Sequence, residues 1–303
     1  MVTFALSYNR WITLRRQIVR KFRGWFFLLL LHPLLHAATD MKSKFFTTSD
    51  GVRLHYLESG AGPTILFVPG WTMPAWIWQP QIDYFSRSYH VIAIDPRSQG
   101  ESEKTPDGNY PGRRAQDYKE LIDHLGGSPV IMVGWSLAVS ESLTFVDMFG
   151  TSQLKGLVLV DLGLYTPVTQ QANDSRYLQF HTFQSDRRHY TETFVRSMYH
   201  KPHSEEYLKK VIEASLKTPT ATGIALIGEL ATRNDQRAVL PKLNIPVLAI
   251  MTAANRSSAE MITANVSGGQ AEVFEDAGHC LFVDDADRFN TLVDNFAKKA
   301  DAR

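Results

Sequence analysis

A serine stands at a sharp predicted turn between an apolar strand and a helix. The β-branched run Val130–Val133 leads into Gly134-Trp-Ser-Leu-Ala138, and helix-compatible residues follow over 139–148. Gly-x-Ser-x-small in this setting is the pattern of a nucleophile elbow, in which a strained turn exposes the serine hydroxyl. We therefore predict that Ser136 is a nucleophile, with the N-terminus of the following helix stabilising negative charge beside it.

The chain resembles the α/β-hydrolase family over about residues 44–298. Its elbow, together with Pro69-Gly-Trp71, is similar to the elbow and oxyanion loop of small bacterial carboxylesterases, among them pimeloyl-ester esterases with GWSLG and HGW at these places. Pro69 of the loop and Ala138 of the elbow differ from that pattern, which argues against a pimeloyl ester as the substrate. The segment Asp95–Ser102 resembles the family's D-x-R-G-x-G-x-S loop with Ser98 in place of glycine, and its charges are interpreted as structural.

A histidine near the C-terminus is the predicted general base. His279 follows Gly278 after the predicted strand Ala271–Phe274, and an amphipathic helical pattern follows over Ala286–Lys298. The resemblance implies a catalytic histidine in this setting, last in the chain order of the triad. A neutral imidazole within hydrogen-bond reach of Ser136 takes its proton and returns it to the leaving group. The other histidines beyond the N-terminal segment are interpreted as surface or packing residues: His55, His90, His124, His181, His189, His200 and His203.

The acid of the triad has two candidate positions. In most of the family it follows the strand that corresponds to Val247–Met251, but Asn255 stands there in this chain. An asparagine orients an imidazole without offsetting the charge of an imidazolium. Some small acyl esterases that the chain resembles carry their acid after the preceding strand, where Leu157–Val160 is followed by Asp161. We predict Asp161 as the acid, because the later position lacks a carboxylate, and we keep Asn255 as the alternative position.

Other carboxylates near the base are assigned structural roles. Asp276 lies too close in sequence to His279 to reach the far nitrogen of its ring, and Asp284 and Asp285 are typical of residues that begin a helix. An aspartate at the position of Asp161 also braces loops in relatives whose acid lies elsewhere. Bracing is therefore the competing interpretation of Asp161.

Two main-chain N–H groups are predicted to form the oxyanion hole. One belongs to Leu137, directly after the nucleophile, and the other to Trp71, after Gly70 at the end of the predicted strand Thr64–Val68. Preorganised donors of this kind stabilise the negative charge that develops on a carbonyl oxygen during acyl transfer. Gly70 allows the loop to approach closely, and the ring of Trp71 is placed to form a wall of the acyl pocket.

The elements that must position these residues alternate along the chain. Short apolar runs between helical patterns predict a mostly parallel sheet, and Arg53–Glu58 predicts an early antiparallel strand. The ligand crevice of such a sheet lies at the carboxyl ends of its strands. We predict an α/β-hydrolase fold with a mostly parallel central sheet flanked by helices. Its core covers 44–165 and 241–298, and a helical lid at 166–240 is inserted after the sixth core strand.

The N-terminal segment 1–38 differs in charge from the rest of the chain. It carries six basic side chains and no Asp or Glu, whereas the remaining 265 residues carry 26 basic and 31 acidic side chains. Basic residues, then the apolar run Trp25–Leu35, then Ala37 and Ala38 form the order of a secretory signal. The run is shorter than the about 20 residues of a spanning helix, so an uncleaved anchor is the weaker alternative. We expect an exported protein, periplasmic or secreted, or a cytoplasmic one if Met41 is the true start.

Composition narrows the class of protein and its partners. The chain has 303 residues, 44% hydrophobic and 21% charged, and its single cysteine excludes a disulfide framework and a zinc site built from cysteines. A mildly acidic body gives no reason to expect nucleic-acid binding. Beyond residues 1–38, no phosphate-binding Gly-rich loop and no His-x-x-x-His pair occurs, so no cofactor and no metal are expected. Membrane contact is expected only through the N-terminal segment, if that segment is uncleaved.

Together these residues predict a serine hydrolase that cleaves a carboxylic ester or lactone through an acyl-enzyme. The expected partner is a small-molecule substrate, uncharged and partly apolar. The resemblance implies an aspartate nucleophile in haloalkane dehalogenases and most epoxide hydrolases, so Ser136 argues against both. Thioesterase, amidase, carbon–carbon hydrolase and perhydrolase activities use the same parts and remain open, as does a non-catalytic binding protein with this fold.

Overall fold

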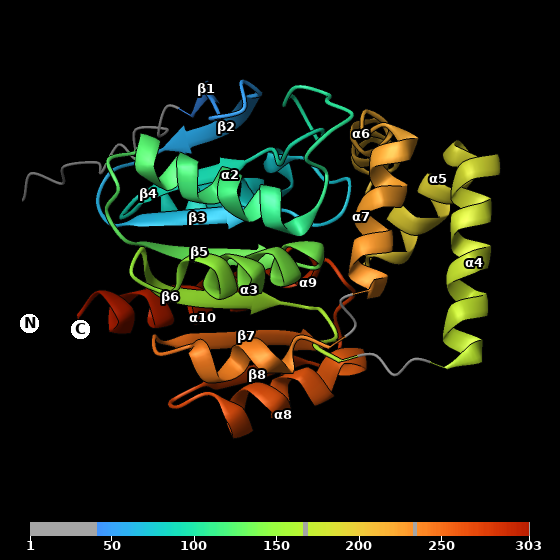
Figure 1. Ribbon diagram of the computed structural model, residues 1–303. Helices are drawn as coiled ribbons and strands as arrows, with labels where there is room; N and C mark the ends of the chain where they lie inside the picture. The colour runs from blue at the N-terminus through green and yellow to red at the C-terminus, as the bar shows by residue number, and fades with distance from the viewer. Residues whose placement is uncertain (1–40, 166–168, 233–234, 303) are drawn as a thin grey trace, which may run out of the picture. The chain divides into compact units, whose positions relative to one another are not determined.

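The computed structural model describes residues 41–165, 169–232 and 235–302. Within these residues eight strands form one sheet in the order β1-β2-β4-β3-β5-β6-β7-β8 (Figure 1). Strands β3 to β8 run parallel to one another, and β2 pairs antiparallel with both β1 and β4. The predicted mostly parallel sheet is therefore confirmed. The strand bounds are β1 Lys42–Thr47, β2 Arg53–Ser59, β3 Thr64–Val68, β4 His90–Ile94, β5 Val130–Trp135, β6 Leu154–Val160, β7 Val247–Thr252 and β8 Gln270–Phe274.

Helices cover both faces of the sheet, because alternate residues of a buried strand point to opposite sides. In β3, Ile65 and Phe67 pack in the core that contains residues of α1 and α10. Leu66 and Val68 pack in a second core with residues of α2, α3 and α8. The bounds of these helices are α1 Gln79–Phe85, α2 Pro111–His124, α3 Leu137–Phe149, α8 Arg256–Asn265 and α10 Ala286–Asp301, with the short α9 at Leu281–Asp284. Short 3₁₀ turns lie at η1 Ala75–Trp78, η2 Arg237–Lys242 and η3 Ala253–Asn255.

Four further helices of the described chain follow β6 and precede β7, inside the interval predicted as a lid. They are α4 Gln170–Ser185, α5 Arg187–Ser197, α6 Glu205–Leu216 and α7 Thr220–Thr232. Figure 1 shows them beyond the carboxyl ends of the parallel strands. Val195 of α5 and Val211 of α6 belong to the same core as α1 and α10, so these helices pack against the sheet domain as well as against one another.

Strand β1 has no counterpart among the strands predicted from the sequence. Five of its six side chains are exposed, so its residues show no buried apolar face from which a strand is predicted. It forms through main-chain pairing with β2, in which Lys42 lies opposite Glu58 and Thr47 opposite Arg53. An edge strand of this kind is specified by its partner and not by its own hydrophobic pattern.

The predicted N-terminal signal or anchor at 1–38 lies outside the described residues. In the part of the chain that the structure describes, no helix is both long and apolar enough to cross a membrane. Export stays a prediction, and we expect sequencing of the mature protein to find its first residue near Ala37 or Ala38.

Candidate active site

The predicted nucleophile lies in a strained turn between β5 and α3. Ser136 has φ 56° and ψ −122°, and it is one of only four non-glycine residues in the described chain with positive φ. The turn requires a small residue before it, because a Cβ at Gly134 would lie 2.6 Å from Ser142 Oγ and 2.7 Å from Ala138 O. A strained backbone conformation of this kind costs of order 1–3 kcal/mol, and it persists because the surrounding structure enforces it. The turn places the Ser136 side chain at the carboxyl end of β5.

Three predicted site residues from separate elements are joined by hydrogen bonds. His279 Nε2 lies 2.8 Å from Ser136 Oγ, and His279 Nδ1 lies 2.7 Å from Asp161 Oδ2. Ser136 follows β5, Asp161 follows β6 and His279 follows β8, so all three lie at the carboxyl edge of the sheet. When Asp161 is ionised, it accepts the Nδ1–H of His279, which leaves Nε2 to accept the hydroxyl proton of Ser136.

The two candidate positions for the acid lie side by side. Asp161 is 2% exposed, and its Oδ1 accepts hydrogen bonds from Asn255 Nδ2 at 2.9 Å and from the N–H and Oγ1 of Thr252 at 2.8 and 2.7 Å. Burial raises the pKa of Asp161, but the hydrogen bond and charge of His279, with the bonds from Asn255 and Thr252, lower that pKa below its ordinary value. Asp161 therefore carries the charge in this pair, and Asn255 holds the carboxylate in place.

Gly70 brings the predicted oxyanion loop against the nucleophile. A Cβ at Gly70 would lie 2.9 Å from Ser136 Cβ, so only glycine allows this approach. Trp71 follows directly in the chain, and Leu137 is the first residue of α3, where helical N–H groups have no acceptor within the helix. Gly70 therefore lies against Ser136, with Trp71 next along the loop and Leu137 next along the elbow, and the oxyanion hole formed by their N–H groups stays a prediction.

Aromatic side chains of α4 and α5 pack against Trp71. Its ring centroid lies 4.9 Å from that of Phe183 in α4 and 5.3 Å from that of Phe194 in α5. Trp71 Nε1 also donates to the carbonyl oxygen of Gly223 in α7, at 2.9 Å. Helices α4, α5 and α7 therefore hold the loop beside Ser136 through an apolar cluster and one hydrogen bond.

A buried glutamine holds the same loop from the sheet side. Gln99 Nε2 donates to Gly70 O at 3.0 Å and to Met73 O at 2.8 Å, and its Oε1 accepts from Arg114 Nη2 at 2.9 Å. Its side chain is fully buried. The loop Asp95–Ser102 is recognisable as a motif in the sequence, but the motif assigns no role to Gln99.

We expect Gln99→Leu to lower kcat about 10- to 100-fold, because two buried carbonyl groups lose their donor at a cost of about 1–3 kcal/mol and the oxyanion loop moves. The measurement is kcat and KM on a reactive ester, with the thermal midpoint recorded in parallel. A variant with a lower midpoint but unchanged kcat at 20 °C would show that Gln99 only stabilises the fold.

The loop that carries His279 is anchored by residues that sequence reasoning missed. Trp135 Nε1 donates to His279 O at 2.8 Å. The buried carboxylate of Asp284 accepts the N–H of Gly278 at 2.7 Å and the N–H of His200 at 2.8 Å, and it also contacts Lys201 N and His203 Nε2. The interpretation of Asp284 as a helix-start residue is wrong, because this residue ends α9 and ties the base to the α5–α6 connection. Nothing in its local sequence distinguishes it from Asp285, which does precede α10.

We expect Asp284→Asn to lower kcat about tenfold with KM little changed, because an amide cannot accept from all of these donors and the His279 loop loses its anchor. Asp285→Asn is the matched control, since this neighbour makes no side-chain cap hydrogen bond and its variant should behave as the wild type. Equal effects of the two substitutions would contradict a positioning role for Asp284.

Cys280, next to the base, is buried and takes no part in these contacts through its thiol. Burial raises the pKa of this thiol well above its ordinary value, so it remains protonated and unreactive. Among the residues that the structure describes, no group of three or more His, Cys, Asp or Glu side chains is arranged to hold a metal ion.

Comparison with known proteins places this fold and site in a family. The sequence model of the Alpha/beta hydrolase family matches residues 65–292. A non-heme haloperoxidase from Rhodococcus erythropolis is 31% identical over 132 residues, which are 43% of this chain and 47% of that protein. A soluble epoxide hydrolase from Corynebacterium sp. is 32% identical over 96 residues, 32% of this chain and 34% of that protein. The chain thus spans less than half the length of either relative.

Comparison with solved structures finds the same fold over most of the chain. An esterase from Exiguobacterium antarcticum superimposes with a TM-score of 0.76 at 22% identity, covering 84% of this chain and all of that one. The chain belongs to the alpha/beta hydrolase family. The α/β-hydrolase fold expected from the elbow and the oxyanion loop is confirmed.

Proposed function

We propose that this protein is a serine hydrolase that cleaves a carboxylic ester or lactone through an acyl-enzyme intermediate. The observation that carries the proposal is the continuous pair of hydrogen bonds from Ser136 through His279 to Asp161, at 2.8 and 2.7 Å. A hydroxyl beside a base that is itself oriented by a carboxylate is the arrangement that nucleophilic acyl transfer requires.

The reaction begins when His279 Nε2 accepts the hydroxyl proton of Ser136 as Oγ attacks the carbonyl carbon. The carbonyl oxygen becomes an oxyanion, which the main-chain N–H groups of Trp71 and Leu137 stabilise, while Asp161 stabilises the imidazolium. The tetrahedral intermediate expels the alcohol, which takes the proton from His279, and Ser136 remains acylated. Water then loses a proton to His279 and attacks the acyl carbon. The second tetrahedral intermediate expels Ser136 Oγ, which takes that proton back as the carboxylic acid is released.

The substrate class follows from the surface beside the oxyanion loop. Trp71, Leu137, Phe183 and Leu226 form one apolar cluster there. A charged group among these side chains would lose its hydration without gaining a partner. These apolar surroundings support an uncharged ester with an apolar acyl or alcohol group as the substrate.

Perhydrolysis is a second candidate, favoured by the similarity to the haloperoxidase of R. erythropolis. Hydrogen peroxide would replace water as the acyl acceptor, so that the acyl-enzyme and peroxide give a peracid and free Ser136. Epoxide opening is disfavoured, although one relative is named an epoxide hydrolase, because Ser136 stands where those enzymes need aspartate.

A fluorophosphonate probe and a panel of p-nitrophenyl esters with graded acyl chains, together with lactones, test the proposal. We expect covalent labelling of the wild type, loss of labelling in Ser136→Ala, and ester turnover that this substitution abolishes. A wild-type protein that neither reacts with the probe nor turns over any ester would instead be a non-catalytic member of the fold. Adding peroxide to the same assays and measuring peracid by iodide oxidation separates perhydrolysis from hydrolysis.

A further inference from the structure

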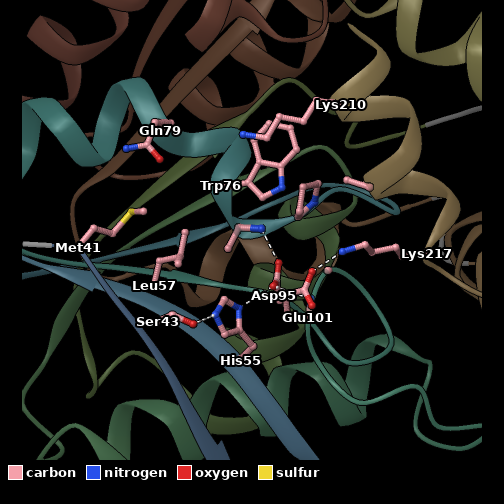
Figure 2. Close-up of a pocket in the computed structure, with 14 residues that line it drawn as sticks. Met41, Ser43, His55, Leu57, Trp76, Gln79, Asp95, Glu101, Lys210 and Lys217 are labelled. Carbon is pink, nitrogen blue, oxygen red and sulfur yellow. Dashed lines mark hydrogen bonds and ion pairs between the residues drawn. The ribbon is translucent and has the colours of Figure 1, made fainter. Parts of the chain in front are cut away.

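A second pocket lies apart from the serine site, between α6 and the β1–β2 edge of the sheet. It has a volume of about 320 Å³ and is lined by residues of β1, β2, η1, the 95–101 loop and α6 (Figure 2). None of Ser136, His279, Asp161 and Trp71 lines it. Pockets that bind small molecules begin at about 300 Å³, so its volume suits a ligand of roughly one aromatic ring.

A row of hydrogen bonds ends on a hydroxyl at this pocket. Ser43 Oγ lies 2.8 Å from His55 Nε2, and His55 Nδ1 lies 2.7 Å from Asp95 Oδ2. The residue types match those of the serine site, but the setting does not. Ser43 lies in an exposed edge strand and is not one of the positive-φ residues, and the Asp95 carboxylate also accepts from Ala75 N and Glu101 N. This row orients the Ser43 hydroxyl as a ligand contact and does not make it a nucleophile.

Helix α6 supplies two ammonium groups to the same pocket. Lys210 and Lys217 are seven residues apart, which is two helical turns, so both line it. Lys217 pairs with Glu101, and because both side chains are more than half exposed this ion pair contributes little. Lys210 Nζ lies 4.1 Å from the centroid of the Trp76 ring, and within the described chain it forms no ion pair with a carboxylate. Lys210 is therefore the cation available to an incoming anion.

Apolar side chains form the remaining walls. Figure 2 shows Met41, Leu57 and Trp76 around one space, with the Gln79 amide beside them and Lys210 next to the Trp76 ring. Such walls bury a ring or a short alkyl group, at about 25 cal/mol per Å² of apolar surface. A ligand that satisfies both features has a compact apolar body and a single negative charge.

We propose that this pocket is a separate binding site for a small aromatic carboxylate, whose carboxylate pairs with Lys210 and whose ring packs between Leu57 and Trp76. The pocket adjoins the segment that continues from the predicted oxyanion loop, and α6 bonds to that segment. Ala75 belongs to the segment that continues from Trp71, and Ser215 Oγ of α6 lies 2.7 Å from Thr72 Oγ1. Ester cleavage releases a carboxylic acid, so a product acid is the natural ligand that fits, a point that rests on the proposed function.

Binding of 4-fluorobenzoate, followed by ¹⁹F NMR line broadening on the full protein, tests the site. We expect saturable binding that Ser136→Ala leaves unchanged and that Lys210→Gln weakens about five- to tenfold, the size expected for one partly exposed ion pair within an apolar site. Lys209→Gln, also exposed on α6 but outside the pocket, is the matched control and should bind as the wild type. The neutral analogue 4-fluorobenzamide should bind equally to the wild type and to Lys210→Gln.

Three results would overturn the proposal. They are no saturable binding of 4-fluorobenzoate, binding that Lys210→Gln leaves unchanged, or binding that is abolished by Ser136→Ala or by prior reaction of Ser136. The last result would place the ligand at the serine site. Because the readout is binding and not turnover, a protein without esterase activity that still binds 4-fluorobenzoate through Lys210 would retain this site and lose only the proposed function.

Discussion

Replacing Asp161 by asparagine is expected to lower kcat for ester hydrolysis by about four orders of magnitude, the size of the effect when the triad aspartate of a serine protease is changed in the same way. The amide keeps the shape of the side chain, but it removes the negative charge that stabilises the His279 imidazolium. It also presents an N–H₂ group where His279 Nδ1–H now donates. The measurement is single-turnover acylation of Ser136 with a p-nitrophenyl ester, with circular dichroism to establish that the variant is folded.

Asn255→Ala is the matched comparison for this prediction. Asn255 donates one of the three hydrogen bonds to Asp161 Oδ1, at 2.9 Å, and the two bonds from Thr252 remain when it is removed. A hydrogen bond to a charged group contributes about 1.5–3 kcal/mol, so we expect Asn255→Ala to lower kcat by no more than about 10- to 100-fold. If Asp161→Asn stays near wild type while Asn255→Ala abolishes turnover, then the acid is assigned to the wrong residue.

The largest effect on stability is expected from Glu141→Leu, which should lower the free energy of unfolding by about 3–5 kcal/mol. Glu141 is fully buried in α3, its Oε1 accepts from Arg114 Nη1 at 2.9 Å, and its Oε2 accepts the hydroxyl of Tyr118. Removing the carboxylate leaves the buried guanidinium of Arg114 without its counterion. Urea unfolding at neutral pH measures the change.

Two further variants distinguish the effect of the unpaired buried charge on stability from the effect of changed side-chain volume. The double variant Arg114→Leu with Glu141→Leu removes both charges, so it should recover part of the stability that Glu141→Leu loses. Tyr118→Phe deletes only one hydroxyl and should cost about 1–3 kcal/mol. A double variant less stable than Glu141→Leu would show that volume, and not the unpaired charge, causes the loss. Arg114 also donates to Gln99, so these variants connect the core of α2 and α3 to the oxyanion loop.

Much of the fold could be predicted because its central strands are buried on both faces. All six residues of β5 and of β7 are buried, and such continuous apolar runs between helical patterns are the signature of a parallel sheet. The edge strand β1 could not be predicted, since its stabilisation comes from pairing with β2. The N-terminal signal and the lid as a functional unit stay predictions.

Ser136 and His279, the proposed nucleophile and base, could be picked out from the sequence because their signals are local. Ser136 needs a small residue two positions before it, and Gly134 supplies this within the same turn. The choice of acid was not local, since Asp161 and Asn255 are 94 residues apart. Only the parallel pairing of β6 with β7 brings their carboxyl ends together, so that one residue holds the other.

The sequence by itself predicted the family and the fold class, and it singled out Ser136, His279 and the loop around Gly70 as candidate site residues, because each depends on steric demands within a few residues of the chain. The tertiary structure decided how Asn255 serves Asp161, why Gln99 and Asp284 matter, and where Lys210 and Ser43 share a pocket. Each of these depends on hydrogen bonds or charges between segments far apart in the chain. Such contacts leave no periodicity or spacing in the sequence, and only the packing of the sheet and its helices brings them into contact.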